Sequence, residues 1–167
     1  MGSMVRFHEQ RRVLVVALAA SLCGCPSPGN GEPSSPPQLA QADLIEVEPN
    51  DEVSQALGVL DFPLVVGGTM SSCGGGGSYA GSDIDRFSFS VAEPSRLLLR
   101  LEVLGGDLDL RLYDPEGDLM ADEDTPGIDA EELQLSIGPG QDYGLELRCW
   151  MGGTPEWRLH FLAELQR

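Results

Sequence analysis

Two short stretches of the sequence carry hard oxygen donors at a spacing that suits a metal ion. Residues 46–51 read E-V-E-P-N-D, and a later stretch holds two aspartates one residue apart. Alternate side chains of an extended chain point the same way, and Ca²⁺ prefers six to eight oxygen ligands. The predicted calcium ligands are Glu46, Glu48, Asn50, Asp51, Asp83 and Asp85. An interpretation without a metal fits equally well: Asp85 caps the start of a strand and residues 48–51 form an Asx turn.

A second acidic cluster lies between residues 122 and 132 and does not match a known calcium loop. Its members are Asp122, Glu123, Asp124, Asp129, Glu131 and Glu132. If Asp122 is placed at the first position of an EF-hand loop, Pro126 and Leu133 occupy two ligand positions. We therefore interpret the cluster as a solvated loop, and a secondary cation site there cannot be located from the sequence.

The residues offer little for catalysis. His160 is the single histidine after the first twenty-five residues, and its strand alternation places it opposite Trp157 and Phe161, away from the expected core. A hydrolytic triad needs a histidine base beside its nucleophile. We expect a protein that is not an enzyme, although a hydrolase with an unrecognised site stays an alternative.

Two cysteines, Cys73 and Cys149, follow the N-terminal region. In an exported protein such a pair is more often a disulfide than a reactive site, so we predict that they are bonded. The alternative is that Cys73, in its glycine-rich surroundings, acts as a nucleophile.

The N-terminal region predicts export. Three arginines precede the apolar run from Val13 to Leu22, which is about half the length of a membrane span. The four residues that end at Cys25 resemble the lipobox of bacterial lipoproteins, which makes residues 1–24 a signal peptide and Cys25 the lipid-attachment site. An ordinary cleaved signal that leaves a free thiol is the alternative. Pro26 is not the aspartate that resembles an inner-membrane retention signal, so by analogy the outer membrane is favoured over the inner one.

The charge of the chain excludes several partners. Of 10 basic and 27 acidic residues, three arginines and Glu9 precede Cys25, which leaves 7 against 26 and a net charge of −19. This charge repels nucleic acid and anionic lipid headgroups. We expect no nucleic-acid partner, and a monomer held at the membrane only through its lipid. The acidity is also what an exported surface needs for solubility.

The elements that must position these residues are strands. Residues 25–42 are rich in Pro, Ser and Gly and predict a tether, whereas residues 43–167 alternate with a period of two. One such run has Phe87, Phe89 and Val91 on one face, and Gly and Pro residues separate the runs. We predict one all-β domain, an antiparallel β-sandwich of about eight strands.

Four blocks in order resemble the bacterial pre-peptidase C-terminal domain. They are E-P-N-D at residues 48–51, G-S-D-I-D-R-F-S-F at 81–89, G-D-L-D-L-R-L-Y-D at 106–114, and residues 140–147. The resemblance spans residues 46–162 and implies a jelly-roll-like sandwich found beside secreted peptidases. It also implies that the six predicted ligands share one calcium ion. We therefore expect a lipid-anchored, non-catalytic module of the cell envelope that binds an extracellular polymer or an envelope protein, or acts as a spacer. An accessory domain for a separately encoded secreted peptidase is the alternative.

Overall fold

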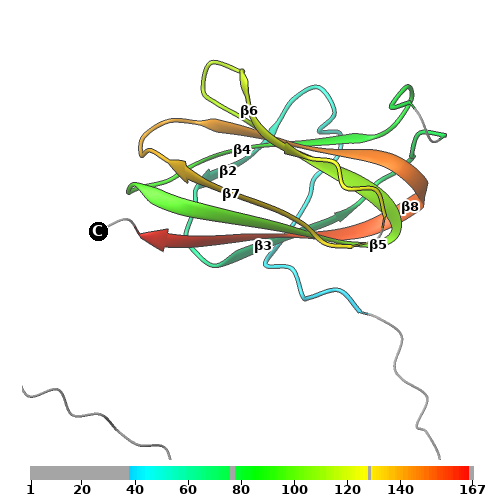
Figure 1. Cartoon of the computed structure of the whole chain (residues 1–167), viewed down its shortest axis with the longest axis horizontal. Helices are drawn as coiled ribbons and strands as arrows, with labels where there is room; N and C mark the ends of the chain where they lie inside the picture. Colours follow the sequence, from blue (N-terminus) through cyan, green and yellow to red (C-terminus); the bar gives the residue numbers. More distant parts are fainter. Residues whose placement is uncertain (1–37, 76–77, 128, 166–167) are drawn as a thin grey trace, which may run out of the picture. The chain divides into compact units, whose positions relative to one another are not determined.

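Every regular element in the part of the chain that the structure describes is a β-strand. The computed structural model describes residues 38–75, 78–127 and 129–165 (Figure 1). The strands are β1 (Leu44–Ile45), β2 (Gln55–Val59), β3 (Leu64–Thr69), β4 (Ile84–Ser90), β5 (Ser95–Tyr113), β6 (Leu119–Glu123), β7 (Glu131–Ile137) and β8 (Tyr143–Leu165). Within these residues no helix is long and apolar enough to cross a membrane. The all-β prediction with about eight strands is confirmed.

Two long strands, β5 and β8, hold the molecule together. They pair antiparallel along almost their whole length and curve together, so each belongs to both layers of the sandwich (Figure 1). One layer joins β2, β4 and β6 to the first half of β8 and the second half of β5. The other joins β1, β3 and β7 to the remaining halves. One continuous sheet thus folds over on itself.

The edge strands differ from the antiparallel prediction. β1 pairs parallel with β3, and β2 pairs parallel with β4. Parallel neighbours require a crossover connection, and here the crossover is the passage between layers. The chain leaves β2, forms β3 in the opposite layer, and returns to form β4 beside β2.

The bends of β5 and β8 depend on glycines. Gly105 and Gly152 have φ angles of +93° and +143°, in the region that favours glycine. A Cβ atom on Gly152 would lie 2.8 Å from the Cα of Gly106, so the two strands touch at the bend. Gly152-Gly153-Thr154-Pro155 is one of the stretches of Gly and Pro that the sequence predicts as a separator of two strands. The structure instead keeps one strand that turns there.

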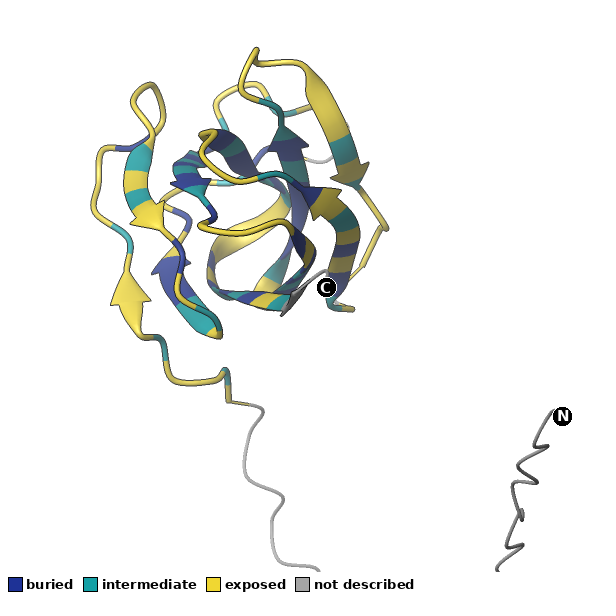
Figure 2. Cartoon of the chain, turned by 90° about the vertical axis from the view of Figure 1, so that its left-hand side faces the viewer, coloured by how far each residue is buried: buried dark blue, intermediate teal, exposed yellow. Residues whose placement is uncertain are grey.

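The core fills the space between the layers. Figure 2 shows buried residues in bands that alternate with exposed ones along the strands, whereas the loops are mostly exposed. Trp157 is completely buried and packs edge-on against Phe87, with ring centroids 5.8 Å apart. It therefore belongs to the core and not to a binding surface.

Two features fasten the ends of the domain. Cys73 and Cys149 are disulfide-bonded with a Cα–Cα distance of 4.9 Å, which ties the loop before β4 to β8. Arg158 Nε donates a hydrogen bond to the carbonyl of Ala40 at 2.8 Å, within the last residues of the predicted tether. The predicted signal peptide and Cys25 lie outside the described residues.

Candidate metal centre

Glu46 reaches the centre because β1 continues along β3. After the pairs Leu44 with Val66 and Ile45 with Gly67, the Glu46 N–H donates to the Gly67 carbonyl at 2.9 Å. The Glu46 side chain then crosses Gly68, and its Oε1 accepts a hydrogen bond from the Thr69 N–H. A Cβ atom on Gly68 would overlap the Glu46 carboxylate. The absence of a side chain at this position is what makes room for the carboxylate.

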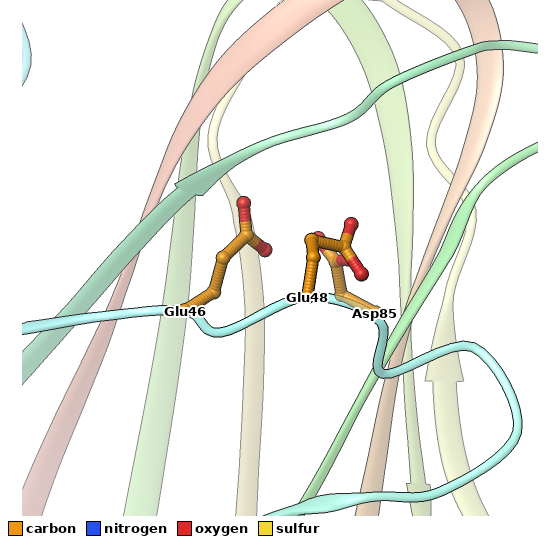
Figure 3. A group of neighbouring side chains, drawn as sticks. All are labelled: Glu46, Glu48 and Asp85. Carbon is orange, nitrogen blue, oxygen red and sulfur yellow. The ribbon is translucent and has the colours of Figure 1, made fainter.

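Three carboxylates meet at this place. Glu46 and Glu48 come from the segment that follows β1, and Asp85 comes from β4 (Figure 3). One oxygen of each lies within 4.8 Å of the others. Asp85 is fully buried, because it shares the inward face of β4 with Phe87 and Phe89. The fold thus brings together three of the six predicted ligands.

Asn50 completes the group from the side. It is 1% exposed, and the end of its amide lies 3.1 Å from Asp85 Oδ1 and 3.2 Å from Glu48 Oε2. Without a cation the amide nitrogen faces these oxygens and donates to both. With a cation between the groups, the amide oxygen would face it as a ligand. The Asn50 side chain can therefore donate hydrogen bonds in the metal-free site and act as an oxygen ligand in the metal-bound site.

The other two predicted ligands are engaged elsewhere. Asp83 is buried, and its carboxylate accepts hydrogen bonds from the N–H groups of Ser71 and Ile84. Asp51 is exposed, and its Oδ1 accepts from the Ile84 N–H at 3.2 Å. These two residues cap the start of β4, the role that the metal-free interpretation had given to Asp85.

The electrostatics of the cluster favour a cation. Burial raises the pKa of Asp85 to about 9, helped by the neighbouring carboxylates of Glu46, Asp83 and Glu48. Burial also raises the pKa of Glu46. Asp85 Oδ2 and Glu46 Oε2 are buried without a hydrogen-bond donor among the described residues. Orphaned carboxylate oxygens that face one another are the donor set of a hard divalent cation.

One part of the second acidic cluster is not a solvated loop. Glu131 is the first residue of β7 and is 4% exposed, so the prediction of a solvated position is wrong for this residue. The period of two that places Leu133 and Ile137 inward also places Glu131 inward. This alternation is the signal that the sequence interpretation missed. Its neighbours Asp107 and Asp109 are buried as well.

The residues considered for catalysis have structural partners. Nε2 of His160 lies 3.3 Å from Oε2 of Glu102, across the pair of β5 and β8. Cys73 is part of the disulfide and is therefore not a free nucleophile.

Comparison with known proteins yields a structural likeness. No protein-family profile matches the chain, and no curated protein matches it. Among solved structures, the pre-peptidase C-terminal domain of a collagenase from Bacillus anthracis is similar, with a TM-score of 0.48 and 16% sequence identity. The similarity covers 71% of this chain and 100% of that domain. The solved domain belongs to the family whose motifs the sequence resembles.

Proposed function

We propose that this chain is a lipid-anchored, non-catalytic module of the cell envelope whose N-terminal segment is fastened to the sandwich by a calcium ion. The observation that carries the calcium part is the meeting of Glu46, Glu48 and Asp85, with Asn50 aimed at two of their oxygens. The lipid anchor rests on Cys25 and its lipobox.

A bound ion would join two separate parts of the chain, because its ligands come from both. Glu46 and Glu48 belong to the segment that continues from the tether, whereas Asp85 belongs to β4, in the layer that also holds β2 and β6. A bound Ca²⁺ would supply the positive charge that these buried carboxylates lack. It would convert a repulsive cluster into a cross-link between that segment and β4.

The tether would set the reach of the module. Residues 25–42 are rich in proline, and in an extended polyproline conformation they would span up to about 50 Å at roughly 3.1 Å per residue. The sandwich would then stand clear of the lipid headgroups and present its surface to an extracellular polymer or an envelope protein. The resemblance to pre-peptidase C-terminal domains favours a second role, as the accessory module of a separately encoded secreted peptidase.

Thermal unfolding with calcium and with chelator tests the metal centre. We expect calcium at one hundred times its Kd to stabilise the protein by about 2.7 kcal/mol per site. Asp85→Asn should reduce the calcium-induced rise in unfolding temperature. The matched variant Asp61→Asn, which removes a charge at an exposed position, should leave this rise unchanged. An Asp85→Asn protein that responds to calcium as the wild type does would exclude this centre.

A pull-down from detergent-solubilised membranes separates the two roles. A binding or spacer module should retain polysaccharide or envelope protein, whereas an accessory module should retain a peptidase. Capture of a peptidase would contradict the role as a binding or spacer module and support the role as an accessory module.

A further inference from the structure

A second group of buried carboxylates lies apart from the proposed centre. Asp107, Asp109 and Glu131 are each 4% exposed, and one oxygen of each lies within 4.8 Å of the others. Asp107 and Asp109 alternate with core leucines on the second half of β5, and Glu131 begins β7. The three side chains meet near the bend where β5 leaves β7.

Glu131 points into this group without a partner. Both of its carboxylate oxygens are buried, and neither accepts a hydrogen bond of ordinary geometry from the described part of the chain. The Leu110 N–H lowers the pKa of Glu131, but this influence is smaller than the burial and the neighbouring charges that raise it. An unpaired buried carboxylate is costly, so a side chain in this state indicates a missing partner of opposite charge.

The two aspartates, in contrast, are held in place. Asp109 accepts a hydrogen bond from the Tyr79 hydroxyl, and Asp107 accepts one from the Gly127 N–H at 3.2 Å. Each of these bonds uses Oδ2 of the aspartate. Such bonds orient carboxylates in the manner of outer-sphere partners at metal sites.

The nearest arginines do not neutralise the group. The guanidinium groups of Arg111 and Arg148 lie over the Tyr79 ring, 5.9 and 5.7 Å from its centroid. Arg148 is also paired with Glu146 at 2.6 Å. Their charges lower the pKa of Asp109, but burial outweighs them and raises this pKa to about 6.

A small pocket borders two of the three carboxylates, Asp107 and Asp109. It has a volume of about 190 Å³, and its lining residues are Tyr79, Asp107, Asp109, Asp124, Pro126 and Trp150. This volume admits a cation together with several waters, which would complete the coordination that three carboxylates begin.

We propose that Asp107, Asp109 and Glu131 form a second site for a hard divalent cation, and that Ca²⁺ is the main ion that binds there. The ion joins the start of β7 to the second half of β5, independently of the centre at Glu46, Glu48 and Asp85. Three carboxylates and water are ligands that suit Ca²⁺ and Mg²⁺ and are poor ligands for softer metals.

Calorimetric titration in the Asp85→Asn background isolates this site. We expect CaCl₂ to bind this variant with a stoichiometry of about one ion per chain. Adding Glu131→Gln or Asp109→Asn should weaken the binding by about tenfold or more. The control Asp122→Asn removes an exposed charge from the neighbouring strand β6 and should leave the binding unchanged. Circular dichroism verifies that each variant retains its β-sheet signal.

Terbium luminescence provides a second measurement. Tyr79 donates to Asp109, and its ring lies 5.0 Å from that of Trp150, so Tb³⁺ in this site would be excited through these aromatic rings. Emission should appear in Asp85→Asn and disappear when Glu131→Gln is added. The proposal is overturned if Asp85→Asn binds neither Ca²⁺ nor Mg²⁺, or if Glu131→Gln and Asp109→Asn leave both the titration and the emission unchanged. Either result would leave the first centre untouched.

Discussion

Asp85 and Glu131 occupy the same kind of position in two different strands. Each begins an inward-facing row whose later members are apolar, Phe87 and Phe89 in β4, Leu133 and Ile137 in β7. Burial raises the pKa of both carboxyl groups to about 9. An acid at the head of an apolar row is therefore buried by the alternation itself, and without a cation beside it the carboxyl group keeps its proton.

These shifts predict a pH dependence in chelator. The unfolded chain releases these protons near pH 4, whereas the folded protein holds them to about pH 9. Folding therefore takes up protons between these values, and the stability that the two groups contribute falls as the pH rises through this window. We expect the Asp85→Asn/Glu131→Gln variant to gain in unfolding temperature over the wild type, by an amount that grows from pH 5 to pH 9 in EDTA. A difference that stays constant with pH would contradict the assigned shifts.

The sequence predicted the residue types of the first centre better than their roles. Glu46, Glu48 and Asp85 do meet, because alternation and an extended segment are local properties. Asp51 and Asp83 instead serve the backbone N–H of Ile84. Which carboxylates find backbone donors depends on how β1 and β4 approach each other, which spacing alone does not specify.

Among the elements, β3 controls the first centre through a glycine. Gly68→Ala would place a methyl group where the Glu46 carboxylate lies and should weaken calcium binding by about tenfold or more without removing any ligand. Gly153→Ala is the matched control, because a Cβ atom there would meet nothing within 4 Å. Calcium titration of the two variants measures the effect. Equal affinities would show that Glu46 does not need this space.

The disulfide that ties the loop between β3 and β4 to β8 should contribute to the stability of the fold. Cys73→Ser/Cys149→Ser frees a segment of 76 residues in the unfolded state and should lower the free energy of unfolding by about 4 kcal/mol on the chain-entropy estimate. Urea denaturation without reductant measures this loss, and reductant should bring the wild type to the same midpoint. A midpoint that neither change moves would mean that the bond contributes nothing to stability.

The strands were predictable and their connections were not. Alternation at Phe87, Phe89 and Val91 located β4 closely, since the side-chain period is a local signal. The sequence predicts a break at Gly152-Gly153, yet in the structure this pair is a bend within β8. A glycine permits both outcomes, and the choice depends on the partner strand that runs alongside.

At the scale of the whole molecule, attachment to the membrane is the property that Cys25 should decide. Cys25→Ser should move the protein from the membrane fraction to the soluble fraction, whereas Cys23→Ser should not. Fractionation followed by mass spectrometry, in search of an acylated peptide that begins at Cys25, measures both outcomes. A Cys25→Ser protein that stays with the membrane would show that something other than this lipid retains it.

The shortage of basic residues bears on both groups of buried carboxylates. With 7 basic against 26 acidic residues from Cys25 onward, the chain has few basic side chains of its own to place beside a buried carboxylate. The composition predicts this shortage of basic residues, but it does not show which buried carboxylates lack a basic partner. The two groups of buried carboxylates, at Asp85 and at Glu131, form only when distant segments of the chain pack together.

The parallel pairing of β1 with β3 also has a mechanical consequence. A pull on the chain from its N-terminal side meets the Ala40–Arg158 hydrogen bond first, then the hydrogen bonds of Asp43 with Val65 and the two-residue β1, and then Glu46 and Glu48. The first two contacts are weak and would yield at low force. An ion bound at Glu46, Glu48 and Asp85 would then hold the N-terminal segment on the sandwich under tension, and the calcium concentration around the protein would set how much load the domain bears.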